Sequence, residues 1–289
     1  MGKERRTGSG PADLAAPEIA GAELSGAELA AAGLTAGLRA GYDAAADHWA
    51  EGPGLMYAPL ATALVAAAPV PLAGAVVLDL GAGVGVAGRA ALAAGARRVA
   101  GADLSEGMLR RGRGGSPVVA DAIALPFRDH SFDLVVAAFC LNHLSCLEAG
   151  LAEARRVGAA IAASMFAPGW THPAKDAVDD AARSFGYRPP AWHTVLAPGS
   201  RASDPEVLAG QAAAAGFTGV RAQVTDVPAG LASPAELAAW RLGMAHFAPF
   251  MRSLDAPGRA AVRRAAEQAV AAVAGASPLV VSMAVLTAG

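Results

Sequence analysis

The stretch at residues 75–88 reads AVVLDLGAGVGVAG and decides the fold. Its first part, AVVLDL (75–80), is a short apolar run rich in β-branched residues, which predicts a buried strand. An alanine-rich helix is expected to follow at 86–94, and its N-terminus adds partial positive charge behind the turn. Between strand and helix, glycines let the backbone turn sharply and approach a ligand closely: Gly81, Gly83, Gly85 and Gly88.

Strands and helices alternate on the C-terminal side of this turn. Strands are expected at 98–103, 117–121, 132–139 and 159–163, and helices at 105–111 and 147–156. This alternation is typical of an α/β fold with a doubly wound, mostly parallel sheet of Rossmann-like type. Further along we expect a strand at 220–227, helices at 233–252 and 258–274, and a last strand at 279–286 that returns to the sheet edge.

The chain length of 289 residues fits one large domain with embellishments. Residues 1–33 are rich in Gly, Ala, Glu and Pro and are expected to form a disordered or weakly helical leader. Residues 34–289 form the domain, which begins with N-terminal helices at 34–51 and 59–68. A helical lid insertion for the substrate is expected at about 167–215, where two helices flank a proline-rich segment.

Composition excludes several classes of protein. Lys and Arg total 23 against 25 Asp and Glu, which argues against nucleic-acid binding because that requires clustered positive charge. Two cysteines, Cys140 and Cys146, are too few for a disulfide framework, and the N-terminus does not resemble a signal peptide, so we expect a cytoplasmic protein. Uncharged runs at 52–78 and 268–289 exceed the roughly 20 residues of a spanning helix. Proline or glycine interrupts both runs, so we expect no membrane segment.

Three interpretations of the glycine turn are open. Read from Gly83, the run G-V-G-V-A-G with Asp103 twenty residues later is the dinucleotide-binding pattern. Asp79, however, would repel a pyrophosphate, whereas its carboxylate suits the ammonium and sulfonium groups of S-adenosylmethionine. The third interpretation is a tight turn between strand and helix that binds no ligand.

Acidic residues also end the next two strands. Asp103 can accept hydrogen bonds from both hydroxyls of a ribose, or it can cap the following helix, although Ser105 can fill that role itself. Asp121 can accept the amino group of adenine, with the amide of Ala122 serving the ring. The alternative for Asp121 is an Asx turn at the start of the loop.

Four motifs carry a family resemblance: VVLDLGAGVGVAG (76–88), GADLSEGML (101–109), ADAIALPFRDHSFDLVV (120–136) and EARRV (153–157). Together they resemble the class I S-adenosylmethionine-dependent methyltransferases, specifically the small-molecule group that includes the ubiquinone and menaquinone biosynthesis methyltransferases. The resemblance implies a Rossmann-like methyltransferase fold with S-adenosylmethionine as cofactor. It becomes weak beyond about residue 166, and Gly-Ala-Ala at 158–160 stands where the family usually has a Pro-Gly-Gly turn.

The same resemblance implies which residues bind the cofactor. The segment YDAAADHWAEG (42–52) is similar to the family's leader helix, in which an aromatic side chain often lies over the cofactor. Tyr42 would take that place, and the alternative is a tyrosine that only packs in the core. The complete expected set is Tyr42, Asp79, Gly81, Ala82, Gly83, Gly85, Asp103, Leu104, Met108, Asp121, Ala122 and Phe139.

The chemistry requires little of the protein, because the cofactor already carries an activated methyl group and the chain mainly aligns the acceptor. His143 follows the fourth strand and is the candidate catalytic base, with a binding or packing role as the alternative. We expect no metal site. Aromatic and histidine side chains on the insertion would suit a planar or lipophilic acceptor, unless they are solvated loop residues: Trp170, His172, Trp192 and His193.

The sequence therefore predicts S-adenosylmethionine-dependent methyl transfer to a small, hydrophobic metabolite of the kind made in secondary metabolism. One alternative keeps the methyltransferase fold for a non-methylating reaction such as cyclisation or ring closure. A binding protein with a vestigial pocket and a nicotinamide-dependent dehydrogenase are further alternatives. The expected partner is a small-molecule substrate, with neither nucleic acid nor a membrane, and the oligomeric state is left open.

Overall fold

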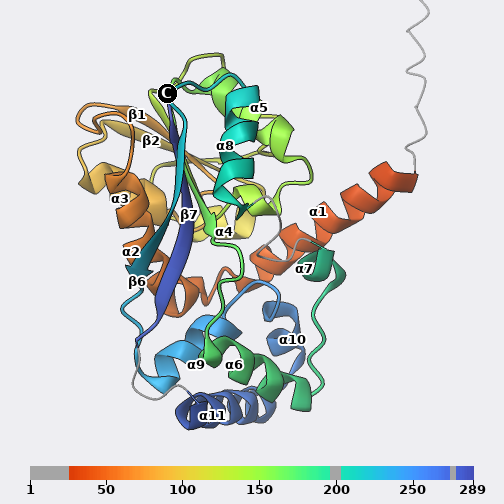
Figure 1. Cartoon of the computed structure of the whole chain (residues 1–289). Coiled ribbons are helices and arrows are strands. Elements are labelled where there is room, and N and C mark those ends of the chain that lie inside the picture. Colours follow the sequence, from red (N-terminus) through yellow and green to blue (C-terminus); the bar gives the residue numbers. More distant parts are fainter. Residues whose placement is uncertain (1–25, 196–202, 274–277) are drawn as a thin grey trace, which may run out of the picture.

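The computed structural model describes residues 26–195, 203–273 and 278–289, which form one sheet with helices packed around it (Figure 1). Most of the predicted leader lies outside the described residues. Within them the sheet has seven strands in the order β3-β2-β1-β4-β5-β7-β6. The strands are β1 (Val76–Leu80), β2 (Arg98–Asp103), β3 (Ser116–Val119), β4 (Leu134–Ala138), β5 (Ile161–Phe166), β6 (Arg221–Pro228) and β7 (Val280–Ala288).

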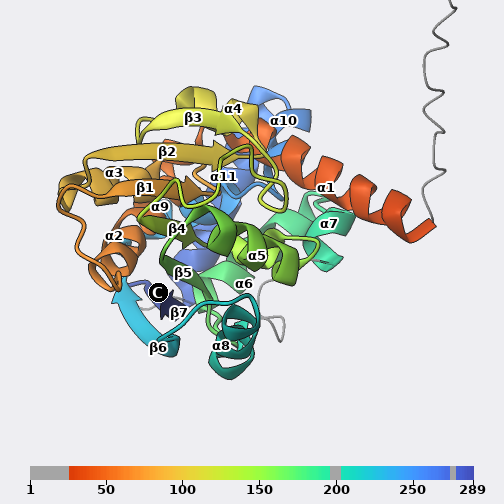
Figure 2. The ribbon, with the colours of Figure 1, turned by 90° about the horizontal axis from the view of Figure 1, so that it is seen from above.

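The strand formed by the opening motif lies at the centre of the parallel part of the sheet. β1 pairs in parallel with β2 and with β4, so that Asp79 lies beside Gly101 on one side and Val136 on the other. β3 and β5 extend the parallel part outward, and Figure 2 shows β3, β2 and β1 side by side. The prediction of a doubly wound, mostly parallel sheet is confirmed.

The position predicted for the last strand is wrong. β7 does not lie at the sheet edge but pairs antiparallel with both β5 and β6, which leaves β6 as the edge strand. An internal position suits β7 because side chains on both of its faces are fully buried, among them Met283, Ala284 and Leu286. β6 instead exposes Val224, which is typical of a strand with one face toward solvent.

Two apolar cores lie on opposite faces of the sheet, and alternate residues of β4 point into each. Leu134 and Val136 pack in the core that includes α2 (Pro53–Ala66) and α3 (Val86–Ala93). Val135 and Ala137 pack in the other core, which includes α5 (Leu147–Val157) and α8 (Pro205–Ala214). In Figure 1 the first pair of helices lies to the left of β7 and the second pair to its right.

The N-terminal helices differ from their expected bounds. α1 (Gly26–Ala45) begins earlier than residue 34 and ends before a 3₁₀ turn, η1 (Trp49–Glu51). α2 begins at Pro53 instead of near Pro59, because Pro53 occupies the first turn, where no backbone N–H is needed. Downstream, α4 (Glu106–Arg111) follows β2, and the 3₁₀ turn η2 (Leu141–His143) follows β4.

A group of helices from two separate segments forms a helical cap beyond the sheet. They are α6 (Pro173–Ser184), α7 (Ala191–Val195), α9 (Pro234–Leu242), α10 (Ala248–Ser253) and α11 (Ala256–Val273). α11 packs on α6 and α9, while α10 and α7 both contact α1. α8 falls within the predicted lid insertion but packs against β6 and β7. The single helix expected at 233–252 is divided into α9 and α10 by residues 243–247.

A buried ion pair joins the two segments of the cap. Arg241 of α9 donates hydrogen bonds from Nε and Nη2 to the two carboxylate oxygens of Asp179 on α6, at 2.6 and 2.8 Å. Within the described ranges, no helix is both long enough and apolar enough to cross a membrane.

Candidate functional site

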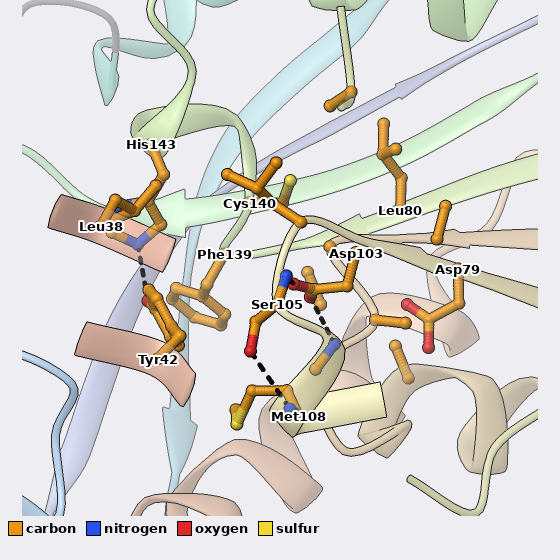
Figure 3. A pocket seen from close by; sticks show the side chains of 18 of the residues that line it. Leu38, Tyr42, Asp79, Leu80, Asp103, Ser105, Met108, Phe139, Cys140 and His143 are labelled. Atoms are coloured by element: carbon orange, nitrogen blue, oxygen red, sulfur yellow. Dashed lines mark hydrogen bonds between the residues drawn. The ribbon is translucent and has the colours of Figure 1, made fainter. Parts of the chain in front are cut away.

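The main pocket lies at the carboxyl ends of β1, β2 and β4, with α1 across it (Figure 3). This is the point where the chain reverses its direction along the sheet, and open α/β sheets usually bind ligands there. Eleven of the twelve residues predicted to bind cofactor line this pocket: Tyr42, Asp79, Gly81, Ala82, Gly83, Asp103, Leu104, Met108, Asp121, Ala122 and Phe139. The candidate base His143 lines it as well.

The glycines of the turn divide into two pairs with different surroundings. Gly81 and Gly83 line the pocket with left-handed φ values of +70° and +53°. A Cβ atom at Gly81 would lie 2.6 Å from both Cβ and Sγ of Cys140, so only glycine fits there. Cys140 packs against the turn in the part of the pocket shown in Figure 3.

The other pair faces away from the pocket. A Cβ atom at Gly85 would lie 2.5 Å from the backbone nitrogen of Gly114, and one at Gly88 would lie 2.3 Å from the Gly114 carbonyl oxygen. Gly85 therefore serves the packing of the turn on the segment after α4, and the structure does not bring it to the main pocket as predicted. The sequence signal that could have shown this is the glycine-rich run at 112–115, which pairs with the turn.

Asp79 is the most buried charged group of the pocket, with 2% of its surface exposed. Its Oδ2 accepts a hydrogen bond from the backbone N–H of Gly88 at 2.7 Å. Burial raises the pKa of this carboxyl to about 7, against the lowering effects of the Gly88 N–H and of Arg89. An ionised carboxylate here lacks a close cation among the described residues, and a positively charged ligand group would stabilise it.

Asp103 ties the end of β2 to the glycine turn. Its Oδ2 accepts from the N–H of Gly83 at 2.7 Å and its Oδ1 from the N–H of Ser105 at 2.8 Å. Ser105 itself caps α4, since its Oγ accepts from the N–H of Met108 at 3.1 Å (Figure 3). Because each carboxylate oxygen can accept more than one hydrogen bond, Asp103 remains able to accept from a ligand. Burial raises its pKa, and the backbone N–H groups oppose this rise.

Asp121 and Ala122 also line the pocket. Asp121 Oδ1 accepts from the backbone N–H of Ile123 at 3.1 Å, which is the Asx turn considered as its alternative role. The turn uses one of the two carboxylate oxygens, so it is compatible with a ligand contact by the other.

Tyr42 of α1 and His143 of η2 lie beside each other in the lining of the pocket. The Tyr42 hydroxyl lies 3.0 Å from His143 Nε2 (Figure 3), while His143 Nδ1 has no hydrogen-bond partner within the described residues. Burial lowers the pKa of His143 to about 4 and raises the pKa of Tyr42 well above its ordinary value. At neutral pH both side chains are therefore uncharged, and the imidazole can accept a proton.

Phe139 has a left-handed backbone with φ +53°, which is uncommon for a residue other than glycine. Its ring lies 5.1 Å from the ring of Tyr57, and the Tyr57 ring is stacked on Trp49 at 5.8 Å. Phe139, Tyr57, Trp49 and Tyr42 all line the pocket and give it an aromatic wall. Tyr57 and Trp49 were not predicted for this role.

Asp43 is a further residue that the sequence analysis missed. Its Oδ1 accepts from Ser105 Oγ at 2.6 Å and from the backbone N–H of Gly107 at 2.9 Å, which fixes α1 on the start of α4. A Cβ atom at Gly107 would lie 2.9 Å from that oxygen, so the glycine permits the contact. The segment 42–52 that resembles a leader helix contains this residue directly after Tyr42.

The four lid candidates do not line the main pocket. The ring of Trp170 stacks on Phe166 at 4.8 Å, and its Nε1 donates to the carbonyl oxygen of Val280 at 3.0 Å. His172 caps α6, where its Nδ1 accepts from the N–H of Ala174 at 3.3 Å. On α7, the Trp192 ring lies 6.4 Å from the ring of Tyr42, and the His193 ring stacks on His246.

Comparison with known proteins agrees with this geometry. Residues 78–160 match the family described as a methyltransferase domain. A demethylmenaquinone methyltransferase of Clavibacter sepedonicus is 46% identical over 97 residues, which cover 31% of this chain and 39% of the relative. The corresponding protein of Thermobifida fusca (strain YX) is 42% identical over 93 residues, or 29% of this chain and 39% of its own length. The chain thus matches about two fifths of the length of these curated relatives.

Two solved structures share the fold. A putative methyltransferase from an antibiotic biosynthesis pathway of Anabaena variabilis has a TM-score of 0.52 at 17% identity, with 80% of this chain and 98% of that chain covered. Phosphoethanolamine N-methyltransferase 2 of Haemonchus contortus, in complex with phosphomonomethylethanolamine and S-adenosylhomocysteine, has a TM-score of 0.51 at 15% identity, covering 85% and 57%. The motifs, the strand order and the matched region agree: residues 78–160 match a methyltransferase domain, and the sheet around them has the Rossmann-like fold of the solved methyltransferases.

Proposed function

We propose that the protein transfers a methyl group from S-adenosylmethionine to a small, hydrophobic metabolite. The observation that carries the proposal is the buried carboxylate of Asp79, which lies in the pocket of the matched domain. Burying an ionised carboxylate without a cation in contact with it is unfavourable. A ligand with a fixed positive charge removes that cost, and S-adenosylmethionine carries both an ammonium and a sulfonium group.

The residues present fit this cofactor. Asp79 would hold the methionyl end, and Asp103 would accept from the ribose hydroxyls. Asp121 and Ala122, which line the same pocket, would hold the adenine. Among the described residues that line the pocket there are three carboxylates, Asp79, Asp103 and Asp121, and one arginine, Arg39.

A dinucleotide fits less well. In the G-V-G-V-A-G pattern the second glycine lets the backbone approach a pyrophosphate. Here that residue is Gly85, and Gly114 occupies the space beside it. Asp79 would add repulsion against the phosphates. The geometry of the turn therefore favours a cationic cofactor over an anionic one.

When bound, the cofactor supplies a methyl group activated by the adjacent sulfonium. Tyr42, Tyr57 and Phe139 form a wall that would orient a flat acceptor and exclude water from the reacting atoms. His143 is neutral at physiological pH and its Nε2 lies 3.0 Å from the Tyr42 hydroxyl in this wall, so it would be the group placed to take the proton of an acceptor that must lose one. Acceptors that are already nucleophilic would react without it.

The proposed acceptor class follows from the lining of the pocket and from the relatives. Beyond the three carboxylates, aromatic and aliphatic side chains such as Leu38 and Leu144 dominate the lining. The relatives named demethylmenaquinone methyltransferase support a hydrophobic, quinone-like acceptor. We extend the proposal to a cytoplasmic enzyme of secondary metabolism whose partner is this small molecule, with neither nucleic acid nor a membrane.

Isotope transfer tests the proposal. The protein is incubated with S-adenosylmethionine labelled in the methyl group and with a panel of hydroxylated aromatic compounds and quinols. We expect labelled product and S-adenosylhomocysteine in equal amounts, and their loss in Asp79→Asn but not in Asp180→Asn, whose carboxylate is exposed on α6. Product formed without S-adenosylhomocysteine would contradict methyl transfer and support the non-methylating alternative.

A further inference from the structure

Trp192 of α7 packs against α1 in a notch made of two glycines. A Cβ atom at Gly41 would lie 2.9 Å from Cζ2 of Trp192, and one at Gly37 would lie 3.0 Å from Cδ1. These glycines are one helical turn apart and leave room for the indole, which is 6% exposed. The Trp192 ring lies 6.4 Å from the ring of Tyr42. The position of α7 therefore influences the pocket wall that Tyr42 forms.

The next residue of α7 makes a second attachment, to the segment between α9 and α10. The rings of His193 and His246 are stacked with centroids 3.8 Å apart and an interplanar angle of 5°. His246 is 4% exposed, and its Nε2 has no hydrogen-bond partner in the described part of the chain. This contact joins α7 to the C-terminal half of the cap, and α7 is thus fixed between two elements.

The charges around the stacked rings oppose protonation. Arg241 of α9 and Lys175 of α6 both act on His193 and His246, and His143 acts on His246 from η2. Asp179 is the carboxylate that acts on His193, but it is bound through both oxygens to Arg241. Tyr187, between α6 and α7, lies 6.5 Å from the His246 ring and is neutral. The stack therefore has no carboxylate of its own within the described residues.

We infer that His246 is a positioning residue for the pocket: as a neutral ring it stacks on His193, holds α7 against α1 and keeps Trp192 behind Tyr42. It acts through His193 and Trp192 and does not line the main pocket itself. Protonation of the stack would place positive charges about 4 Å apart beside Arg241, which breaks the attachment. The inference goes beyond the proposed methyl transfer and is tested without any acceptor.

The size of the effect follows from proton linkage. Burial lowers the pKa of His193 to about 4 from an ordinary value of 6.5, and lowers the pKa of His246 well below that value. The detached state binds protons below pH 6.5, while the attached state does not until about pH 4. Attachment is therefore complete above pH 6.5 and weakens as the pH falls through that window. At pH 5 the loss from His193 alone is about 30-fold.

Hydrogen exchange measured by mass spectrometry tests this on the full chain. Protection of the amides at 187–195 is compared at pH 7.5 and 5.0, after correction for the intrinsic exchange rates. We expect the wild type to lose protection about 30-fold at pH 5.0. His246→Ala should lose protection already at pH 7.5, and His246→Phe should restore it, because phenylalanine keeps a flat ring for the stack. The double variant His193→Phe/His246→Phe should lose the response to pH.

His172→Asn is the matched control. His172 is another partly buried histidine of the cap, and asparagine keeps its role as the helix cap of α6. This variant should retain the wild-type response to pH. Equal protection of the wild type at both pH values would overturn the inference, and so would wild-type protection in His246→Ala at pH 7.5. If the double variant does not fold, the wild-type pH response and the two single variants still decide.

Discussion

The glycine turn and the helical cap satisfy their buried polar groups in different ways. At the turn, the carboxylates of Asp79 and Asp103 accept hydrogen bonds from the backbone N–H groups of Gly88 and Gly83. In the cap, side chains pair with side chains from another segment, as Asp179 does with Arg241. The first arrangement is encoded within about 30 residues, while the second joins helices 62 positions apart. Changes at the turn should therefore alter ligand binding, and changes in the cap should alter stability.

The largest expected effect is in the cap. Arg241→Met leaves the carboxylate of Asp179, which is 8% exposed, without its partner. Removing one member of a buried ion pair costs about 3–5 kcal/mol, and we expect that loss in the free energy of unfolding by urea. Asp179→Leu/Arg241→Met should recover most of the stability. Arg183→Met, which breaks the exposed pair with Asp180, is the control and should have a much smaller effect.

The second effect is at the glycine turn, where the change should weaken ligand binding but raise the stability of the ligand-free protein at pH 8. Asp79→Asn should weaken binding of S-adenosylmethionine about 100-fold, since a hydrogen bond to a charged group contributes about 1.5–3 kcal/mol. The same variant should unfold at a higher temperature at pH 8 than the wild type does. Without ligand, we expect the wild type to be less stable than Asp79→Asn at pH 8 but not at pH 4.

The sign of this pH dependence follows from burial. The pKa of Asp79 is about 7 in the folded protein against an ordinary value of 3.8. Between these values the unfolded chain has lost the proton and the folded one has kept it, so stability falls as the pH rises. Asparagine does not titrate, and the difference between the two proteins isolates this group. Equal pH profiles of the two melting temperatures would contradict the assignment of a raised pKa.

A smaller effect separates backbone strain from a steric clash. Gly81 and Gly169 both have φ +70°, but a Cβ atom meets Cys140 at Gly81 and nothing within 4 Å at Gly169. Gly169→Ala should cost about 1 kcal/mol from the left-handed backbone alone. Gly81→Ala should cost about 1–3 kcal/mol more and should also weaken binding of S-adenosylhomocysteine. Equal unfolding free energies of the two variants would show that Cys140 moves aside freely.

The smallest expected effect concerns the attachment of α1. Asp43→Ala removes the acceptor for Ser105 Oγ and for the N–H of Gly107. Because α1 covers the pocket, we expect affinity for S-adenosylhomocysteine to fall about tenfold, which corresponds to about 1.4 kcal/mol. Asp47→Ala is the matched control, since Asp47 lies just after the end of α1 and, among the described residues, pairs with the exposed Arg111. Calorimetric titration of both variants distinguishes a specific bond from a general loss of charge.

The same contrast explains what could be predicted from sequence. The strand-turn-helix around Gly81 and the acid at the end of β2 are local patterns, and both were placed correctly in the fold. Gly85 was assigned to the cofactor because its neighbours fit a motif, whereas its contact with Gly114 depends on how a later loop returns. The spacing of residues within one motif cannot show that a later loop packs back against it.

The cap was least accessible to prediction for the same reason. His246 gave no signal in the sequence, because its partner His193 lies 53 positions earlier on another helix. The Gly37 and Gly41 notch is visible as a spacing of four, but only the structure shows that Trp192 fills it. The edge position predicted for the last strand was wrong because β6, from much earlier in the chain, pairs along the outer edge of β7, and the local pattern of the last strand does not show that pairing.

Calorimetric titration with three ligands shows whether this pocket holds a cationic cofactor. S-adenosylmethionine, S-adenosylhomocysteine and NAD are each titrated into the wild-type protein and into Asp79→Asn. We expect the wild type to bind the first two ligands, the variant to bind them more weakly, and neither protein to bind NAD. Binding of NAD, or equal affinity of S-adenosylmethionine for both proteins, would contradict this expectation.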